Sequence, residues 1–294
     1  MVEDNIRNLP VLMFDDILED VNRLMYNSVK QYDEARTLFD QVEDLLMRHL
    51  GNYVPKAIEP FNNIIPFSSL KSNRLDPHMH DPYTNYLYHA ISTLGEYTKL
   101  SEVAFVWGAA RFKRHYLSAD NPNGVGLCSS PSDIVRANLS ASKYISRVLN
   151  LKELEKCTIS GETIFIPCSG AYGGVLGHGM LTGSIMDGKS VTQHVIRIAR
   201  KEATDPGFFY YLAAFLCSDN FEYHLITTTR FGKDIPEIAP AGLEDILIPR
   251  LDSSIEKEIG TMFHKATNLQ EQANMSENTA IKLIEENYEK MIID

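Results

Sequence analysis

Two stretches with coiled-coil spacing bracket this chain of 294 residues. In the first, mostly apolar or small residues, with a few polar ones among them, recur in alternating steps of four and three, a repeat of 3.5 residues that is typical of a helix packed along its length against another helix. This seam consists of Ile17, Val21, Leu24, Ser28, Gln31, Ala35, Leu38, Val42, Leu45 and His49. We expect Gly51 and Pro55 to end the helix.

The second stretch lies at the other end of the chain and has the same alternation. Its seam consists of Met262, Ala266, Leu269, Ala273, Ser276, Ala280, Leu283 and Asn287. The small residues in it allow a partner backbone to come close. The pattern therefore predicts a helical assembly element on each side of a working domain.

The negative charge of the chain lies almost entirely in these two flanks. The net charge is −11, with 5 Lys and Arg against 11 Asp and Glu in residues 1–54, and 4 against 9 in residues 251–294. Residues 55–250 carry 19 of each and are neutral. Because phosphate binding requires local positive charge, the distribution argues against contact between the helices and a nucleic acid, but not against a nucleic-acid partner for the central part.

Length and composition are compatible with one globular domain on a helical stalk, because 44% of the residues are apolar. Pro55, Pro60 and Pro66 block continuation of the first helix and indicate a linker. We therefore expect a long N-terminal helix in residues 1–54, a globular domain in 55–250 and a long C-terminal helix in 251–294.

Short strand-like segments dominate the middle of the chain. We expect strands over 103–108, 163–168 and 190–198, and a helix from Pro82 to Glu96. A second helix should begin with Asp205 as N-cap and Pro206 as first residue, and run through Leu216. The predicted fold class is α+β: one loop-rich domain with a mixed sheet, flanked by two long coiled-coil-forming helices.

Cysteine usage and hydropathy predict a reduced, cytoplasmic setting. The four cysteines form no Cys-x-x-Cys pair, and the N-terminus lacks the pattern of a signal peptide. The longest apolar runs, such as residues 208–216, are too short to span a membrane. We expect a soluble protein.

The segment RFKRHY, residues 111–116, is the densest positive cluster in the sequence. In an extended loop, some of its side chains could contact phosphates while an arginine reaches a guanine edge. A solvated basic loop explains the cluster equally well. A second group, Arg197, Arg200 and Lys201, is more typical of ordinary surface charge at the end of a strand.

The glycine-rich run CSGAYGGVLGHG, residues 168–179, lacks the following amphipathic helix and the distant acidic residue of a dinucleotide site. Its glycines favour a tight turn and a close approach to a partner, with Ser169 and Tyr172 as polar contacts. We find no metal-ligand spacing, cofactor motif or catalytic signature in the sequence. These observations favour a binding module over an enzyme.

The order of features is similar to a known family. The long helix is followed by RLDPHMHDPY, RFKRHY, LCSSPSDI, KYIS, ISGETIFIPCSGAYG, SVTQHVIRI, FFYYLAAFLCS, TTRFGKDIPEI, LEDILIP and a terminal helix. This succession resembles the specificity subunit of type I restriction-modification systems. Members of that family carry two target-recognition domains separated by helices that pair antiparallel, whereas this chain has one domain between two helices. It resembles half of such a subunit.

The resemblance implies a non-catalytic subunit without a cofactor that reads half of a bipartite DNA target. Its partners would be double-stranded DNA, an adenine-N6 DNA methyltransferase subunit that docks on the helices, a restriction subunit, and a second copy that pairs through the helices. The DNA-contacting residues implied by the resemblance are Arg111, Lys113, Arg114, Tyr116, Ser129, Ser130, Ser132, Ser169, Gly170, Tyr172, Gln193, His194 and Arg230.

Two other classes remain open at the level of the sequence. The net charge of −11 is compatible with a coiled-coil adaptor whose α+β domain binds another protein rather than DNA. A hydrolase with an unrecognised site is a third class. The sequence also leaves open whether the chain dimerises, pairs with a different chain, or is a truncated product.

Overall fold

A computed structural model describes most of the chain. The described residues are 15–50, 93, 95–108, 111–128, 141, 143–170, 174–219, 221–222, 230–231 and 237–293, without the side chains of 15, 16, 230, 231 and 291–293. Residues 51–92, which contain most of the helix predicted over Pro82–Glu96, lie outside the described part. Gly95, with a φ of 90°, leads directly into a strand, so that helix does not continue to Glu96.

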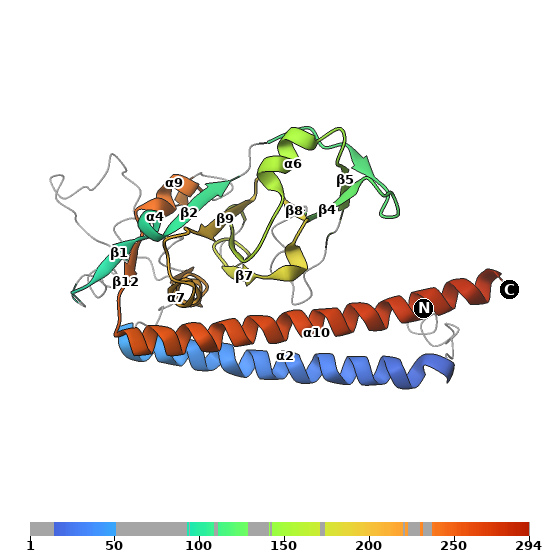
Figure 1. The fold of residues 1–294 in the computed structure, drawn as a ribbon, viewed down its shortest axis with the longest axis horizontal. Coiled ribbons are helices and arrows are strands. Elements are labelled where there is room, and N and C mark those ends of the chain that lie inside the picture. The colour runs from blue at the N-terminus through green and yellow to red at the C-terminus, as the bar shows by residue number, and fades with distance from the viewer. Residues whose placement is uncertain are drawn as a thin grey trace, which may run out of the picture.

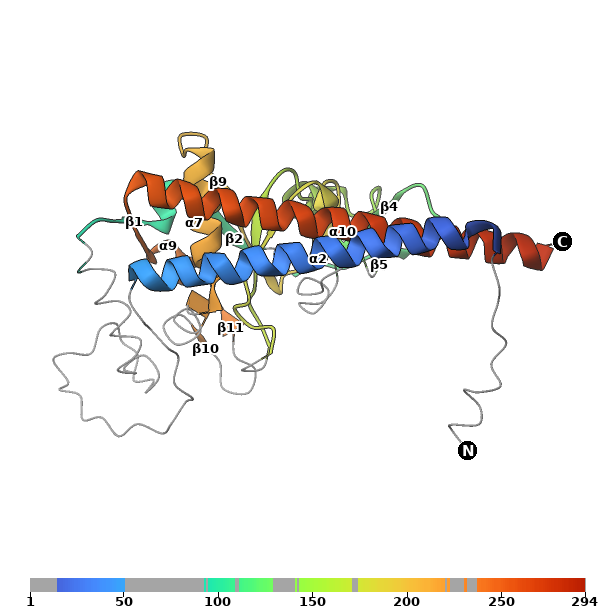
Figure 2. The same ribbon diagram turned by 90° about the horizontal axis from the view of Figure 1, so that it is seen from below.

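Two long helices form an antiparallel pair that runs along one side of the molecule (Figures 1 and 2). They are α2 (Asp15–Leu50) and α10 (Ser253–Ile293). Every residue of both predicted seams is buried or partly buried. The seams are therefore confirmed, and each seam finds its partner in the same chain.

Small residues bring the two backbones close together, as the spacing predicts. Ser28, which is buried, donates a hydrogen bond from Oγ to the carbonyl oxygen of Ala273 on the opposite helix, at 3.0 Å. Nearer the domain, the rings of Phe39 and Phe263 meet edge to face, with centroids 5.4 Å apart. Small residues in the middle and aromatic residues near the domain thus fix the register of the pair.

The domain between the helices contains two four-stranded sheets among the described residues. The first is antiparallel, with order β2-β9-β6-β7; its strands are β2 (Ala104–Gly108), β9 (Val195–Arg200), β6 (Thr163–Pro167) and β7 (Met180–Thr182). The second is mixed, with order β3-β5-β4-β8; its strands are β3 (Tyr116–Leu117), β5 (Lys143–Ser146), β4 (Gly124–Cys128) and β8 (Ser190–Val191), and only β4 and β8 run parallel.

Shorter elements complete the described part of the domain. Two-stranded ribbons join β1 (Tyr97–Lys99) to β12 (Leu247–Pro249) and β10 (Arg230–Phe231) to β11 (Glu237–Ile238). The helices are α4 (Leu100–Val103), α6 (Leu151–Cys157), α7 (Pro206–Leu216) and α9 (Pro240–Glu244), with a 3-10 turn at Ser184–Met186. The α+β class with a mixed sheet and two long flanking helices is confirmed.

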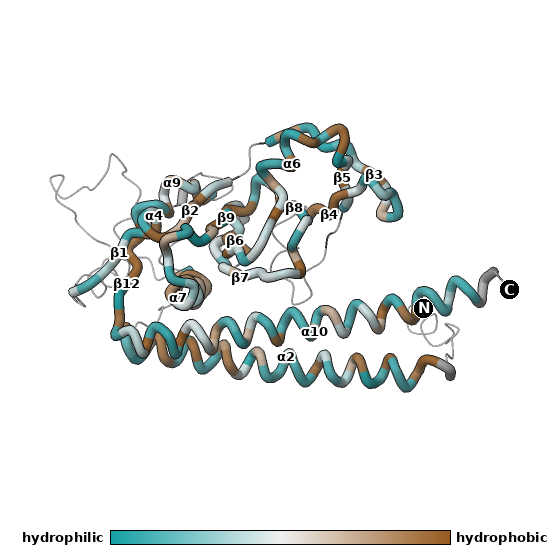
Figure 3. Tube along the Cα trace, viewed as in Figure 1, coloured by the Kyte–Doolittle hydropathy of each residue, from teal (hydrophilic) through white to brown (hydrophobic). Residues whose placement is uncertain are grey.

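Helix α7 connects the domain to the helix pair. It begins as predicted, because the Asp205 carboxylate accepts a hydrogen bond from the backbone N–H of Phe208 at 3.0 Å and Pro206 occupies the first position. Most of its side chains are buried, and Figure 3 shows a largely hydrophobic helix beside α10. The main core lies here, between the antiparallel sheet, α7 and the start of α10.

The segment predicted as one strand over 190–198 is two strands in different sheets. A turn at Thr192–His194 separates them, closed by a hydrogen bond from the Val195 N–H to the Thr192 carbonyl at 3.3 Å. The turn contains neither glycine nor proline, the residues by which a turn is usually recognised in a sequence. The prediction that Arg197 is surface charge is also wrong, because this side chain is fully buried. Strands 103–108 and 163–168 are confirmed as β2 and β6.

In the part of the chain that the structure describes, no helix combines the length and the apolar character needed to cross a lipid bilayer.

Candidate functional site

Four of the residues predicted to contact DNA form one hydrogen-bonded chain. Arg114 donates from Nη2 to Oε1 of Gln193 at 2.5 Å. Nε2 of Gln193 lies 2.8 Å from Nε2 of His194, and Nδ1 of His194 lies 2.7 Å from Oγ of Ser169. Three segments of the sequence, around residues 114, 169 and 193, therefore meet at one place.

The turn between β8 and β9 presents Gln193 and His194. On one side, the Cys168 N–H donates to the His194 carbonyl at 2.8 Å, and the Cys168 thiol donates to the Gln193 carbonyl at 3.4 Å. On the other side, the buried guanidinium of Arg197 donates to the carbonyl of Val191 at 2.9 Å. The backbone of this turn is thus held at both ends, which fixes where its side chains point.

The loop before β3 presents Arg114. Asn150, which is buried, donates from Nδ2 to the Lys113 carbonyl at 2.8 Å, and its Oδ1 accepts from the His115 N–H at 3.0 Å. The two bonds bracket Arg114. Its guanidinium lies 5.7 Å from the centroid of the Phe112 ring, and its Nε has no hydrogen-bond partner among the described residues.

The hydrogen bonds define the proton positions in the network. Because Arg114 can only donate, Oε1 of Gln193 must face it, and the Gln193 NH₂ group then donates to Nε2 of His194. The proton of a neutral His194 therefore sits on Nδ1 and points to Ser169. Burial lowers the pKa of His194 below its usual value of 6.5, and the charges of Arg111 and Arg114 lower it further.

A cavity of about 450 Å³ opens beside this network. Its wall includes Arg111, Ser169, Gln193, His194 and Glu237. Glu237 lies in β11, whose residue Ile238 donates a backbone hydrogen bond to the Cys168 carbonyl at 2.8 Å. The cavity thus combines one exposed guanidinium, one carboxylate and the polar groups of the network.

The Ser169–His194 pair is not arranged as a catalytic dyad with an orienting acid. In such a site a carboxylate bonds the second imidazole nitrogen and stabilises the imidazolium. Here that nitrogen accepts from the amide of Gln193, and the nearby arginines disfavour the imidazolium. The arrangement suits hydrogen-bond recognition better than proton transfer.

The remaining predicted residues are more scattered. Lys113 is exposed, and Gly170 follows Ser169. Tyr116 lies in the second sheet, half exposed, with the Lys143 ammonium 5.4 Å from its ring centroid. The backbone of Arg230 pairs with Ile238 in the ribbon next to the cavity. Ser129, Ser130, Ser132 and Tyr172 lie outside the described residues.

Sequence reasoning missed Asn150, Lys143 and Glu237. Glu237 lies in the motif TTRFGKDIPEI and Lys143 in the motif KYIS, but neither motif indicates a role for these side chains. Asn150 has no signal beyond its position after a strand, because its role depends on contacts with residues more than 30 positions earlier in the chain.

Comparison with solved structures connects this arrangement to a known fold. The S subunit of a type I restriction-modification system from M. genitalium superimposes with a TM-score of 0.50 at 11% sequence identity, over 91% of this chain and 56% of that one. The chain has the fold of a type I specificity subunit. The HsdS subunit from Thermoanaerobacter tengcongensis matches with a TM-score of 0.39 at 11% identity, over 90% of this chain and 56% of its own.

The present chain therefore spans a little over half the length of these specificity subunits. No protein-family model and no curated protein matches its sequence. The resemblance inferred from the order of motifs is confirmed at the level of the fold, at an identity where sequences alone carry little similarity.

Proposed function

We propose that the chain is the DNA-recognition subunit of a type I-like restriction-modification complex, and that its central domain reads half of a bipartite target. The observation that carries this proposal is the network of Arg114, Gln193 and His194 on two adjoining loops. Arginine pairs with guanine and glutamine with adenine through two hydrogen bonds each in the major groove. A surface that holds both side chains in fixed orientation is suited to reading bases.

The charge distribution supports a division of labour between domain and helices. The neutral domain can approach DNA, whereas the acidic helices would be repelled by phosphates. Helix α10, with 41 residues, extends about 60 Å, which exceeds the roughly 34 Å of one DNA turn. The pair is long enough to set the spacing between two half-sites.

The helix pair also offers a surface for other subunits. Its seams are used within the chain, so a partner must bind elsewhere on the helices. Large apolar side chains are exposed toward the start of α2 and the end of α10: Leu18, Met25, Tyr26, Val29, Met275, Ile281, Ile284 and Tyr288. We propose that this surface docks an adenine-N6 DNA methyltransferase subunit and a second copy of the chain, with a restriction subunit joining through that complex.

A titration of random duplex DNA tests the proposal. The purified chain should bind weakly alone, because a neutral domain releases few counterions, and strongly together with an adenine-N6 DNA methyltransferase subunit with which it assembles. Nanomolar binding by the lone chain at physiological salt would contradict the division of labour. A different result is that the chain binds the methyltransferase without adding to its DNA affinity. That result would identify a protein adaptor.

A further inference from the structure

A second group of chemically active side chains lies away from the recognition network, where the domain meets the helix pair. The imidazole of His178 and the carboxylates of Asp219 and Glu222 converge there, with one ligand atom from each within 4.8 Å of the others. Nδ1 of His178 is 3.2 Å from Oε2 of Glu222. Nothing in the recognition of DNA requires this cluster.

The fold positions the three groups from two separate segments. Ser218 starts a helical turn after α7, since its Oγ accepts from the Phe221 N–H at 3.3 Å, and the spacing of three places Asp219 and Glu222 on one face of that turn. His178 comes from the segment before β7. Its neighbour Gly179 packs so closely against α7 that a Cβ there would lie 2.7 Å from the Leu216 carbonyl oxygen.

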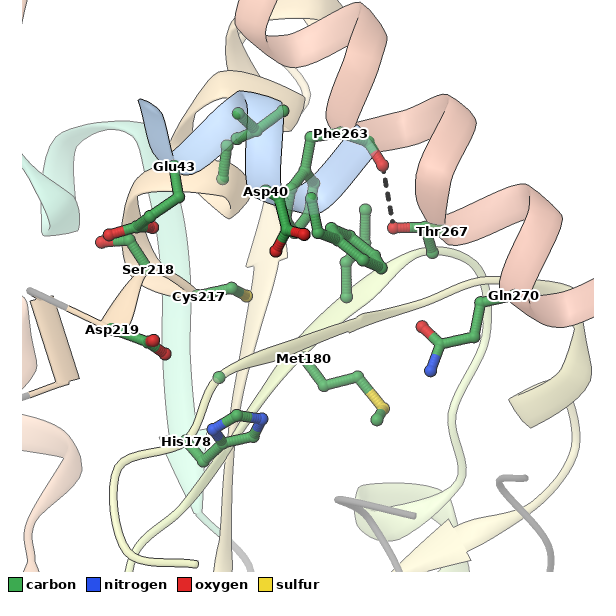
Figure 4. A pocket seen from close by; sticks show the side chains of 15 residues that line it. Asp40, Glu43, His178, Met180, Cys217, Ser218, Asp219, Phe263, Thr267 and Gln270 are labelled. Atoms are coloured by element: carbon green, nitrogen blue, oxygen red, sulfur yellow. Dashed lines mark hydrogen bonds between the residues drawn. The ribbon is translucent and has the colours of Figure 1, made fainter. Parts of the chain in front are cut away.

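Two of the three groups, His178 and Asp219, line a cavity of about 380 Å³ between α2, α7, β7 and α10. Figure 4 shows His178 and Asp219 among the side chains that line it, together with Asp40 and Glu43 from α2. The described lining contains these three carboxylates and no lysine or arginine. The carboxylates of the lining therefore face no lysine or arginine within it, which favours a cation.

We propose that His178, Asp219 and Glu222 bind a divalent transition-metal ion of the Zn²⁺ type. Ligand atoms at about 2.1 Å from one ion are at most about 4.2 Å apart, so the observed spacing needs only a small rotation of side chains that are mostly exposed. A nitrogen ligand with two carboxylates favours Zn²⁺ over Mg²⁺ or Ca²⁺, which prefer oxygen ligands alone.

The position of the ion suggests what it does. It would join the segment before β7 to the turn after α7, beside the α2 carboxylates that line the same cavity. Water molecules would complete its coordination. The ion would thereby hold these two segments of the domain together next to the helix pair, without taking part in DNA contact.

Isothermal titration of the full chain with Zn²⁺ tests this site. We expect one Zn²⁺ ion per chain, with no comparable binding of Mg²⁺. His178→Ala and Glu222→Gln should each weaken the binding at least about tenfold, since even the loss of a group that only orients a ligand costs about 10- to 100-fold. Circular dichroism shows whether each variant is folded, and the glutamine variant provides a second reading where the alanine variant is not.

The matched controls are His264→Ala and Glu162→Gln. His264 and Glu162 form the same kind of pair, with Nε2 and Oε1 3.0 Å apart, but belong to no three-ligand group among the described residues. These variants should bind Zn²⁺ like the wild type. The proposal is overturned if the folded wild type does not bind Zn²⁺, or if His178→Ala and Glu222→Gln bind it as tightly as the wild type.

A Co²⁺ spectrum distinguishes this site from the cysteines. Ligation by His178 and carboxylates gives no thiolate-to-metal charge-transfer band, whereas binding at a cysteine does. Because a histidine must be deprotonated to bind a metal ion, protons compete with the ion, and the affinity should fall as the pH is lowered. A charge-transfer band that accounts for the bound ion contradicts the site.

Discussion

The amide of Gln193 has a donor on one side and an acceptor on the other, so its orientation depends on both neighbours. Arg114 holds its oxygen and His194 accepts from its NH₂ group. Replacement of either neighbour allows the amide to rotate, and this would change the pattern that the surface shows to a base edge. Arg114, Gln193 and His194 therefore act as one unit.

Arg114→Ala tests this unit directly. We expect it to weaken specific DNA binding by the assembled complex by about 1–3 kcal/mol where the arginine holds a base, and to reduce the salt dependence where it holds a phosphate. Arg36→Ala, an exposed arginine on α2, removes the same charge far from the network and serves as the control. Equal affinity and equal salt dependence for Arg114→Ala and wild type would remove Arg114 from the DNA interface.

The lowered pKa of His194 predicts a pH dependence of stability. Above its usual pKa of 6.5 neither the folded nor the unfolded chain protonates this group, and it contributes no pH dependence. As the pH falls below that value the unfolded chain takes up the proton first, so the free energy of unfolding decreases until the folded pKa is passed. Denaturant unfolding from about pH 7 to about pH 5 should show this decrease in wild type and a smaller one in His194→Gln.

His178 changes the free energy of unfolding with pH in the opposite direction. Wild type alone therefore does not report on His194 and must be compared with His194→Gln. Its pKa is raised, so it adds stability below its usual pKa and loses it as the pH rises through the folded value. The difference between the pH profiles of wild type and His194→Gln gives the contribution of His194. An unchanged pH profile in His194→Gln would contradict the lowered pKa of His194.

The sequence identified the residues of the hydrogen-bonded network around Gln193 but not the contacts between them. The four residues stand in three separate motifs, around Arg114, Ser169 and the neighbours Gln193 and His194. Two of the bonds that join them span 79 and 25 positions of the chain. No spacing rule reaches over such distances. The same reason explains why the His178 cluster escaped notice, since its histidine is far from its two carboxylates in sequence.

Among the elements, α7 depends most on close backbone contact. It lies against α10 at Gly260, where an added Cβ would be 2.8 Å from the Gly207 carbonyl oxygen and 2.9 Å from the Tyr211 backbone nitrogen. Both of these atoms belong to the backbone of α7, so neither can rotate away. The contact fixes the angle at which the domain sits on the helix pair.

Gly260→Ala should therefore destabilise the protein by about 1–3 kcal/mol, the usual cost of overpacking a tight contact. The better helix propensity of alanine opposes this by about 1 kcal/mol, so the clash must exceed that gain. Denaturant unfolding measures the difference. Thr261→Ala, at the next and exposed position, should stay within about 0.5 kcal/mol of wild type. A stabilised Gly260→Ala protein would show that the two helices are not in contact there.

Periodicity predicted some elements well and others poorly, for a physical reason. The seams of α2 and α10 extend over many turns, so their burial pattern repeats often enough to be read. A seam indicates that a partner exists, however, and does not say whether it lies in the same chain. In β9, Val195, Ile196, Arg197 and Ile198 are all buried, which removes the alternation by which a strand is recognised.

For the molecule as a whole, the intramolecular helix pair changes how a second copy can bind. A two-fold dimer cannot use the seams, which are already filled, and must use the exposed apolar side chains toward the free end of the pair. Two such copies would read an inverted repeat. Mass measurement in solution should give a dimer of the chain, alone or with its methyltransferase. A monomer under both conditions contradicts the symmetric arrangement.

The most direct test of DNA recognition by this chain is the sequence preference of the assembled complex. A random duplex DNA library is passed over the chain bound to the methyltransferase subunit proposed as its partner, and the retained duplexes are sequenced. If this chain reads DNA, the retained duplexes should be enriched in a defined half-site, and in two half-sites at a fixed spacing where two copies assemble. Arg114→Ala should reduce this preference. A library that stays random, or the same enrichment by the methyltransferase without this chain, would contradict the assignment of DNA recognition to this subunit.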